Sequence, residues 1–141
     1  MQTAEKLKNK LIQKAWCFPF LIKLFPLTIN YKLCYNDPMI IKHTRDTLSE
    51  TYLDAVAIRN TVFVKGQGVP RSIEIDANEA YCIHFVLYDD KGQPAATVRL
   101  LPNKELTQVT LQRMAVLDDY RGQGMGSILL REAEDFAQEQ G

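Results

Sequence analysis

Apolar residues recur along residues 39–141 with two different spacings. Alternating or continuous apolar runs predict β-strands, because successive side chains of a strand point to opposite faces. Apolar residues three or four positions apart predict helices. The predicted strands are 39–44, 81–88, 95–101 and 109–116, and the predicted helices are about 47–64 and 127–140. The order is therefore strand, helix, loop, hairpin, strand, turn and helix.

Local signals set the expected ends of these elements. The run Thr47-Leu48-Ser49-Glu50 matches a capping box with Thr47 as the N-cap, and Lys65-Gly66 is an expected helix stop. Asp89 to Gly92 reads as the turn of the hairpin. In the last helix an apolar stripe is expected to pack into the core; it consists of Leu129, Leu130, Ala133, Phe136 and Ala137.

The strand over 109–116 changes its phase partway along. Val109 and Leu111 share one face, whereas Met114 and Val116 share the other. Because a strand has a period of two, such a flip predicts a β-bulge near Gln112-Arg113.

A glycine-rich turn joins this strand to the last helix. Its sequence is Arg121-Gly122-Gln123-Gly124-Met125-Gly126. Amide groups at a helix N-terminus have no partner within the helix, and glycines let the backbone approach an anion, so the turn predicts a phosphate or pyrophosphate site. No Lys-Ser/Thr pair follows the last glycine, and the glycine spacing is not that of a dinucleotide-binding turn. A tight turn without a ligand is the alternative.

Charge is balanced over the whole chain but not along it. The 141 residues carry a formal net charge of zero, which gives no case for a nucleic-acid partner. Residues 1–38 contain six lysines, one glutamate and one aspartate, a net charge of +4. We therefore divide the chain into a basic, apolar N-terminal extension, 1–38, and a folded domain, 39–141.

The extension has no clear targeting signal. Its uncharged apolar run, Ala15 to Ile22, is too short to span a bilayer, Pro19 interrupts it, and no small-residue cleavage site follows. A basic, aromatic segment can rest on an anionic membrane surface. We favour an unstructured extension without membrane contact, which a natural start at Met39 would lack.

Cysteine and histidine usage argues against a metal centre. Cys17, Cys34 and Cys82 are odd in number and do not have metal-ligand spacing, and the chain has only two histidines. This pattern is typical of a reducing compartment, so we expect a cytoplasmic protein with no bound metal.

The order of elements and two motifs resemble the GNAT superfamily of acetyl-CoA-dependent N-acetyltransferases. The first motif is Met114-Ala115-Val116-Leu117-Asp118-Asp119-Tyr120 running into the glycine turn, and the second combines 59–64, 67–70 and 73–76. The resemblance covers 39–141. It implies an α+β fold of the three-layer αβα type, in which helices flank a mostly antiparallel, mixed sheet.

The resemblance also implies roles for particular residues. The backbone of Arg121, Gly122, Gln123, Gly124, Met125 and Gly126 would bind the pyrophosphate of acetyl-CoA, and that of Met114, Ala115 and Val116 would pair with the pantetheine arm. An amine of a small molecule or protein would attack the thioester directly, which requires a general base. Glu74 is the first candidate base and Asp76 the second; alternatively both are surface or capping carboxylates. We expect His84, Tyr88 and Tyr120 to be structural.

The chain departs from the family pattern in two places. The family continues with a further strand, a helix and more strands, whereas this sequence ends at Gly141, so we expect the C-terminal strands to be missing. The strand over 109–116 would then be an open edge, which invites self-association. Lys65-Gly66 stands where relatives often have acidic residues. The alternative function is therefore a non-catalytic CoA-binding or interaction module.

Overall fold

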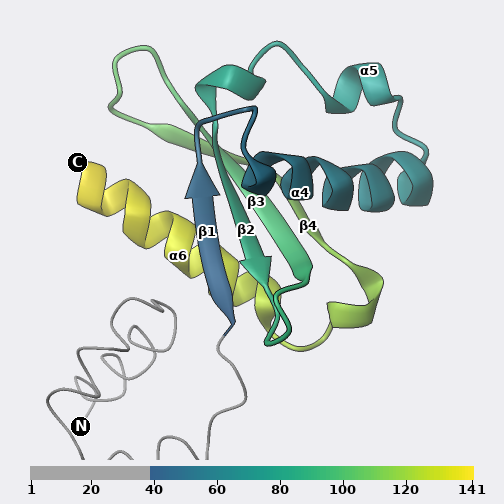
Figure 1. Ribbon diagram of the computed structural model, residues 1–141. Helices are drawn as coiled ribbons and strands as arrows, with labels where there is room; N and C mark the ends of the chain where they lie inside the picture. The colour runs from purple at the N-terminus through teal and green to yellow at the C-terminus, as the bar shows by residue number, and fades with distance from the viewer. Residues whose placement is uncertain (1–38) are drawn as a thin grey trace, which may run out of the picture.

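Four antiparallel strands form the centre of the computed structural model, which describes residues 39–141 (Figure 1). The strands follow one another across the sheet in the order β1-β2-β3-β4. Their bounds are Ile40–Thr44 for β1, Ile83–Tyr88 for β2, Pro94–Pro102 for β3 and Val109–Val116 for β4. Within the described residues, β1 and β4 are the two edge strands.

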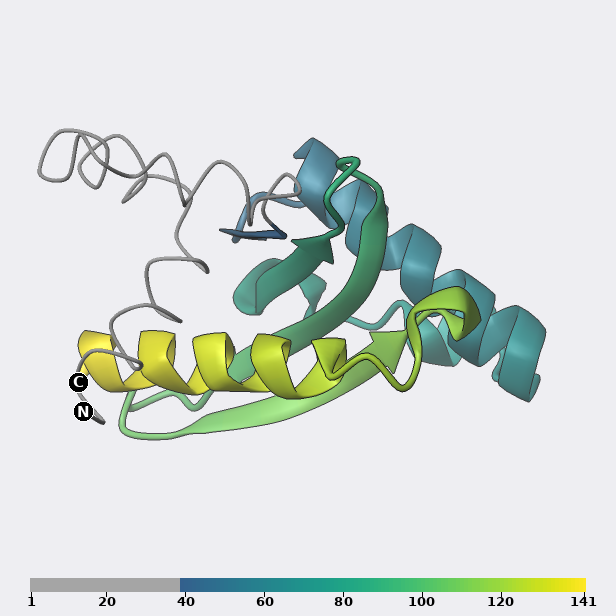
Figure 2. The ribbon, with the colours of Figure 1, turned by 90° about the horizontal axis from the view of Figure 1, so that it is seen from below.

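Helices cover both faces of the sheet, as the sequence predicted. Figures 1 and 2 show α4 on one face and α6 on the other. The helical segments are α4 (Glu50–Arg59), the π-helical turn η2 (Asn60–Lys65), α5 (Arg71–Glu74), the 3-10 turns η3 (Glu79–Tyr81) and η4 (Asp118–Tyr120), and α6 (Met125–Gln140). The three-layer αβα class is therefore confirmed.

Each face of the sheet has its own hydrophobic core. Alternate side chains of β2 and β3, such as Phe85 and Val98, pack against α6 through Leu129 and Ala133. On the other face Val86, Tyr88 and Ala115 pack against Ala55, Ile58 and Val62. Because both faces are covered, β2 reads as a continuous apolar run rather than an alternating one. Leu130 of the predicted stripe is only half-buried.

The boundaries of the first helix differ from the prediction. Its N-cap is Ser49, whose hydroxyl accepts a hydrogen bond from the Tyr52 amide at 3.2 Å, so the capping box with Thr47 was wrong. Gly68, at φ +71°, ends the helical run two residues beyond the predicted stop: its amide bonds the Val64 carbonyl at 3.1 Å. Gly66 keeps a right-handed conformation, so the left-handed position that favours glycine lies later.

The predicted bulge in β4 is confirmed. The pairing of β3 with β4 steps from Thr97–Ala115 to Arg99–Gln112, so β4 contains one residue more than β3 over this interval. Arg113 lies within the step and has φ +56°. A left-handed, non-glycine residue at this point bends the edge of the sheet directly before Met114.

The expectations for residues 1–38 fall outside the described part of the chain. Within residues 39–141, no helix has the length and apolar character needed to cross a bilayer.

Candidate functional site

The glycine turn has the backbone conformation that its sequence predicted. Gly122 and Gly124 both have φ near +76°, in the left-handed region, and Gly124 is the N-cap of α6. A Cβ atom added at either position would meet nothing within 4 Å, so the space beside both residues is open. The turn therefore exposes its backbone on an unobstructed side.

The start of α6 presents amide groups to this open side. The amide of Ile128 donates to the Gly124 carbonyl at 3.1 Å and closes the first turn of the helix. The amides of residues 125–127 therefore have no acceptor within the helix, and the helix dipole adds partial positive charge there. Met125 begins the helix two residues earlier than predicted.

Gly126 lets the start of α6 lie close to β4. A Cβ atom at this position would be 3.3 Å from Cε of Met114 and 3.5 Å from Cγ2 of Val116. The start of α6 thus packs directly against side chains of the bulged strand.

The polar side chains of the turn fold back onto the segment before it. Arg121 donates from Nε to the Val116 carbonyl at 3.2 Å and forms an ion pair with Asp118 at 2.9 Å. Gln123 donates from Nε2 to the Asp119 carbonyl at 3.2 Å. These contacts hold both side chains against the segment 116–119.

A hydrogen bond ties the turn to the hairpin between β2 and β3. The Tyr120 hydroxyl donates to Asp89 Oδ2 at 2.7 Å, and Asp89 also accepts from the amides of Lys91 and Gln93. The bond with Asp89 raises the pKa of Tyr120. This contact agrees with the structural role expected for Tyr120.

Two cavities lie beside β4 and the segment 117–121 that follows it. A cavity of about 350 Å³ adjoins the bulge, and its lining includes Arg113 and Met114. A second, of about 450 Å³, adjoins the end of the strand and the turn, and its lining includes Leu117 and Arg121. Residues of η2 line both: Phe63 the first, and Thr61 and Val62 the second. Met114 lines the first cavity and Asp118 the second, and an extended chain spans about 13 Å between these two residues.

Glu74 lies in the wall of the cavity beside the bulge. Its side chain is buried, with Oε1 2.6 Å from Nε of Arg59 and Oε2 3.1 Å from Nε of Arg113. A buried carboxylate between two guanidinium groups is paired rather than free. Glu74 and Met114 thus line the same cavity, and the Glu74 carboxylate is paired with two guanidinium groups.

Asp76 is held in a similar way farther along the same segment. Both of its carboxylate oxygens accept from Arg99, at 3.0 and 2.6 Å. Nη2 of Arg113 lies 3.4 Å from Oδ2. The hydrogen bonds from Arg99 lower the pKa of Asp76. A lowered pKa makes this carboxylate a weak proton acceptor at neutral pH.

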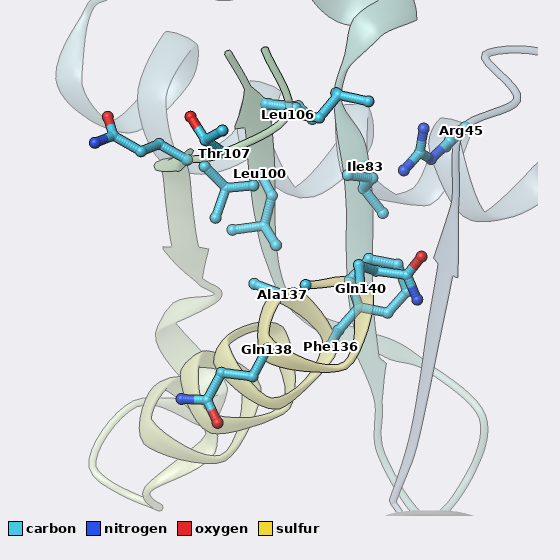
Figure 3. Close-up of a pocket in the computed structure, with 13 residues that line it drawn as sticks. Arg45, Ile83, Leu100, Leu106, Thr107, Phe136, Ala137, Gln138 and Gln140 are labelled. Carbon is cyan, nitrogen blue, oxygen red and sulfur yellow. The ribbon is translucent and has the colours of Figure 1, made fainter. Parts of the chain in front are cut away.

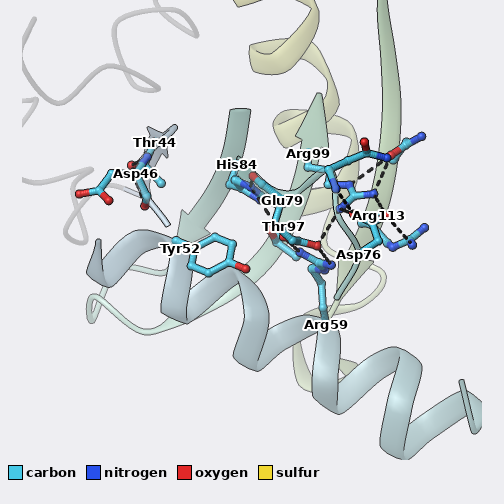
Figure 4. Close-up of polar contacts among 12 residues, drawn as sticks. Thr44, Asp46, Tyr52, Arg59, Asp76, Glu79, His84, Thr97, Arg99 and Arg113 are labelled. Carbon is cyan, nitrogen blue, oxygen red and sulfur yellow. Dashed lines mark hydrogen bonds and ion pairs between the residues drawn. The ribbon is translucent and has the colours of Figure 1, made fainter. Parts of the chain in front are cut away.

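Arg59 and Arg99 form a network of charged side chains with Glu74, Asp76 and Glu79, which we call the charge network. Glu79 bonds with both arginines and was not anticipated from the sequence. It accepts from Arg59 at 3.0 and 2.7 Å and from Arg99 at 2.7 Å (Figure 4). Burial alone would raise the pKa of Glu79, but the hydrogen bonds from Arg59 lower it below its usual value. Arg99 carried a signal: it stands between the apolar residues Val98 and Leu100 of β3, and a buried arginine needs partners.

The buried histidine has no access to either cavity. His84 is fully buried in β2, its Nε2 lies 2.9 Å from the Glu79 carbonyl, and burial lowers its pKa. This agrees with the packed role predicted for it. No group of three or more histidine, cysteine or acidic side chains within residues 39–141 is placed to hold a metal ion.

A further cavity lies at the opposite end of the sheet. It has a volume of about 350 Å³ between the C-terminal turn of α6 and the loop joining β3 to β4, and its lining includes Leu100, Leu106 and Phe136 (Figure 3). None of the residues predicted to contact a cofactor lines it.

Comparisons with known proteins agree with this architecture. Residues 43–141 match the Acetyltransferase (GNAT) family. The uncharacterized N-acetyltransferase YjcF of Bacillus subtilis (strain 168) is 35% identical over 92 residues, which cover 65% of this chain and 64% of the relative. The chain therefore spans less than two thirds of that relative's length.

Solved structures show the same fold. A putative N-acetyltransferase from Lactobacillus plantarum superposes with a TM-score of 0.66 and 31% identity, covering 73% of this chain and 69% of that one. An acyl-CoA N-acyltransferase from Pseudomonas aeruginosa superposes with a TM-score of 0.60 and 27% identity, covering 71% of this chain and 72% of that one. Together with the match over 43–141, these findings show that the chain belongs to the GNAT family of acetyltransferases.

Proposed function

We propose that this chain binds acetyl-CoA along β4 and transfers its acetyl group to an amine of a small molecule or protein. The observation that carries the proposal is the left-handed turn at Gly122 and Gly124, which presents the first amides of α6 beside a bulged edge strand. Pyrophosphate suits such amides because they and the helix dipole stabilise negative charge. The residues present thus fit a CoA pyrophosphate.

The pantetheine arm would lie along the backbone of Met114, Ala115 and Val116. Among the described strands β4 pairs only with β3, so the other side of this backbone has no strand partner. The Val116 carbonyl accepts from Arg121, and that side chain would have to move for the arm to pair with Val116. The two cavities fit this path, since one adjoins the bulge and the other the turn.

The acceptor amine would enter the cavity between the bulge and α5. Its nitrogen would attack the thioester carbonyl carbon directly, the C–S bond would then break, and the thiolate would leave as CoA after taking up a proton. The attacking amine must lose a proton, for which Glu74 is the first candidate because it lines this cavity. Asp76 is the second; it does not line this cavity, and the hydrogen bonds from Arg99 lower its pKa.

A second candidate function is CoA binding without catalysis. The pairing of Glu74 with Arg59 and Arg113 favours it, since two neighbouring guanidinium groups stabilise the carboxylate and oppose its uptake of a proton. The substrate class and the small-molecule or protein acceptor rest on the resemblance, and the cytoplasmic location rests on cysteine usage; all three stay predictions.

Two measurements on the full chain separate these functions. Calorimetry with acetyl-CoA tests binding, and release of CoA thiol in the presence of a polyamine, an amino sugar or a lysine-containing peptide tests transfer. Absence of binding would refute both functions. Binding without thiol release for any amine would leave the non-catalytic function, whereas release that Glu74→Gln abolishes would support transfer with Glu74 as the base.

A further inference from the structure

Arg113 combines an unusual backbone with long-range side-chain contacts. It has φ +56°, a conformation that residues with long side chains rarely adopt, at the step in pairing between β3 and β4. Such a residue persists where surrounding contacts hold it in place.

The side chain of Arg113 crosses from β4 to the segment 71–76. Its Nη2 donates to the Ile73 carbonyl at 3.2 Å and lies 3.4 Å from Asp76 Oδ2, while its Nε lies 3.1 Å from Glu74 Oε2. One guanidinium group thus contacts three residues of a segment about 40 positions away in the sequence.

That segment is itself anchored to the sheet. Arg59 binds the Glu74 carboxylate and carbonyl. Arg99 binds Asp76 through Nη1 and Nη2 (Figure 4). Arg99 also donates to Gln112 Oε1 at 2.8 and 3.2 Å. Gln112 and Arg113, which precede Met114, therefore both contact the charge network. These contacts hold the bulge in a fixed position relative to α5.

The cavity beside the bulge lies between the parts that Arg113 joins. Arg113 and Met114 form its β4 side, and Ile73 and Glu74 form its α5 side. We propose that Arg113 is a positioning residue, which ties the segment 71–76 to the bulge and so sets the geometry between the acceptor amine and the thioester. This inference rests on the proposed function, because it assigns the cavity to the reacting groups.

Arg113→Gly isolates the side chain from the backbone. Glycine adopts a φ of +56° without strain, so this substitution removes the contacts while keeping the bulge accessible. Arg113→Lys keeps one charged donor but not the planar group that reaches three partners. Arg71→Ala is the matched control, because Arg71 lies exposed on the same segment and lines no cavity beside β4.

Hydrogen exchange of the full chain without ligand tests whether the Arg113 side chain holds the segment 71–76 in place. The amides of Ile73, Glu74 and Ile75 donate within the α5 turn. We expect them to exchange at least fivefold faster in Arg113→Gly, at an intermediate rate in Arg113→Lys, and at the wild-type rate in Arg71→Ala. Unchanged exchange in Arg113→Gly would overturn the proposal, whether or not the chain acts on acetyl-CoA.

Kinetics then tests the positioning role, with the panel amine that the wild-type chain acetylates fastest. We expect Arg113→Gly to lower kcat at least tenfold while the Kd for acetyl-CoA stays within threefold, and Arg113→Lys to restore part of kcat. A wild-type kcat in Arg113→Gly would overturn the proposal, as would an equal loss in Arg71→Ala. A wild-type chain that binds no acetyl-CoA would refute the proposed function and, with it, the catalytic part of this inference. The exchange rates would still show whether Arg113 holds the segment 71–76 against β4.

Discussion

Gly124→Ala separates the conformational role of the glycine turn from its role in binding. Gly124 has φ +76° and no atom within 4 Å of where a Cβ would stand. Alanine therefore creates no clash, and its effect on stability comes only from the left-handed backbone. That conformation costs a residue with a Cβ about 1–2 kcal/mol, which corresponds to a fall in Tm of roughly 5–10 °C for a domain of this size.

Gly92 offers a matched control in the same molecule. It has the same φ of +76°, the same open surroundings, and lies in the turn between β2 and β3 rather than at α6. Gly92→Ala should therefore lower Tm by a similar amount. If the amides of the glycine turn bind pyrophosphate, only Gly124→Ala should also weaken binding. We expect the strained turn in Gly124→Ala to relieve part of the conformational cost by a shift of its backbone, which misplaces an amide. Misplacing one amide that donates to a charged group costs about 1.5–3 kcal/mol, or roughly a tenfold to a hundredfold increase in Kd.

Thermal unfolding followed by circular dichroism gives the first quantity, and calorimetry with CoA gives the second. The reasoning would be refuted if Gly124→Ala and Gly92→Ala changed the Kd for CoA equally, since the loss would then follow stability alone. It would also be refuted if Gly124→Ala destabilised the chain but bound CoA as tightly as the wild type.

Three other predictions concern the anchor of the turn, the charge network and the sheet edge. Tyr120→Phe removes the bond to Asp89, and we expect calorimetry to give a Kd for CoA a few times higher, with a loss of stability of about 1 kcal/mol. Asp76 and Glu79 have folded pKa values below their usual 3.8 and 4.5, and the folded pKa of His84 lies below its usual 6.5, so the unfolded chain binds more protons in acid. Thermal unfolding should show stability that begins to fall below about pH 6.5, where the unfolded histidine takes up a proton, and that falls further as pH drops through the folded pKa values of the two carboxylates. Within residues 39–141 the outer edge of β4 has no strand partner, which predicts self-association, and Leu111→Lys should shift the sedimentation coefficient of concentrated protein toward the monomer.

Each of these predictions has a control. Tyr81→Phe alters an exposed tyrosine away from the glycine turn, so an equal loss of CoA affinity there would contradict the anchoring role of Tyr120. Asp76→Asn should reduce the acid dependence, and an unchanged profile would show that the network does not cause it. Leu53→Lys changes an exposed leucine on α4; if it dissociated the protein as well as Leu111→Lys does, the sheet edge would not be the interface.

The sequence by itself determined the main strands and helices and the local geometry of the glycine turn. The phase flip between Leu111 and Met114 predicted the bulge, and the glycines at 122 and 124 predicted the left-handed turn. Both are properties of a few consecutive residues, because strand period and permitted φ act locally. Boundaries were less accurate where two local signals competed, as with Thr47 and Ser49 for the N-cap of α4.

Only the tertiary structure decided the surroundings of the candidate bases. The sequence offered Glu74 and Asp76 as candidate bases or as surface or capping carboxylates. In the fold they face arginines from three other elements: Arg59 lies 15 residues before Glu74, and Arg99 and Arg113 lie 23 and 37 residues after Asp76. No spacing along the chain encodes such pairs. They form because α4, β3 and β4 pack together around the segment 71–76, and a guanidinium group that loses water there must find a carboxylate.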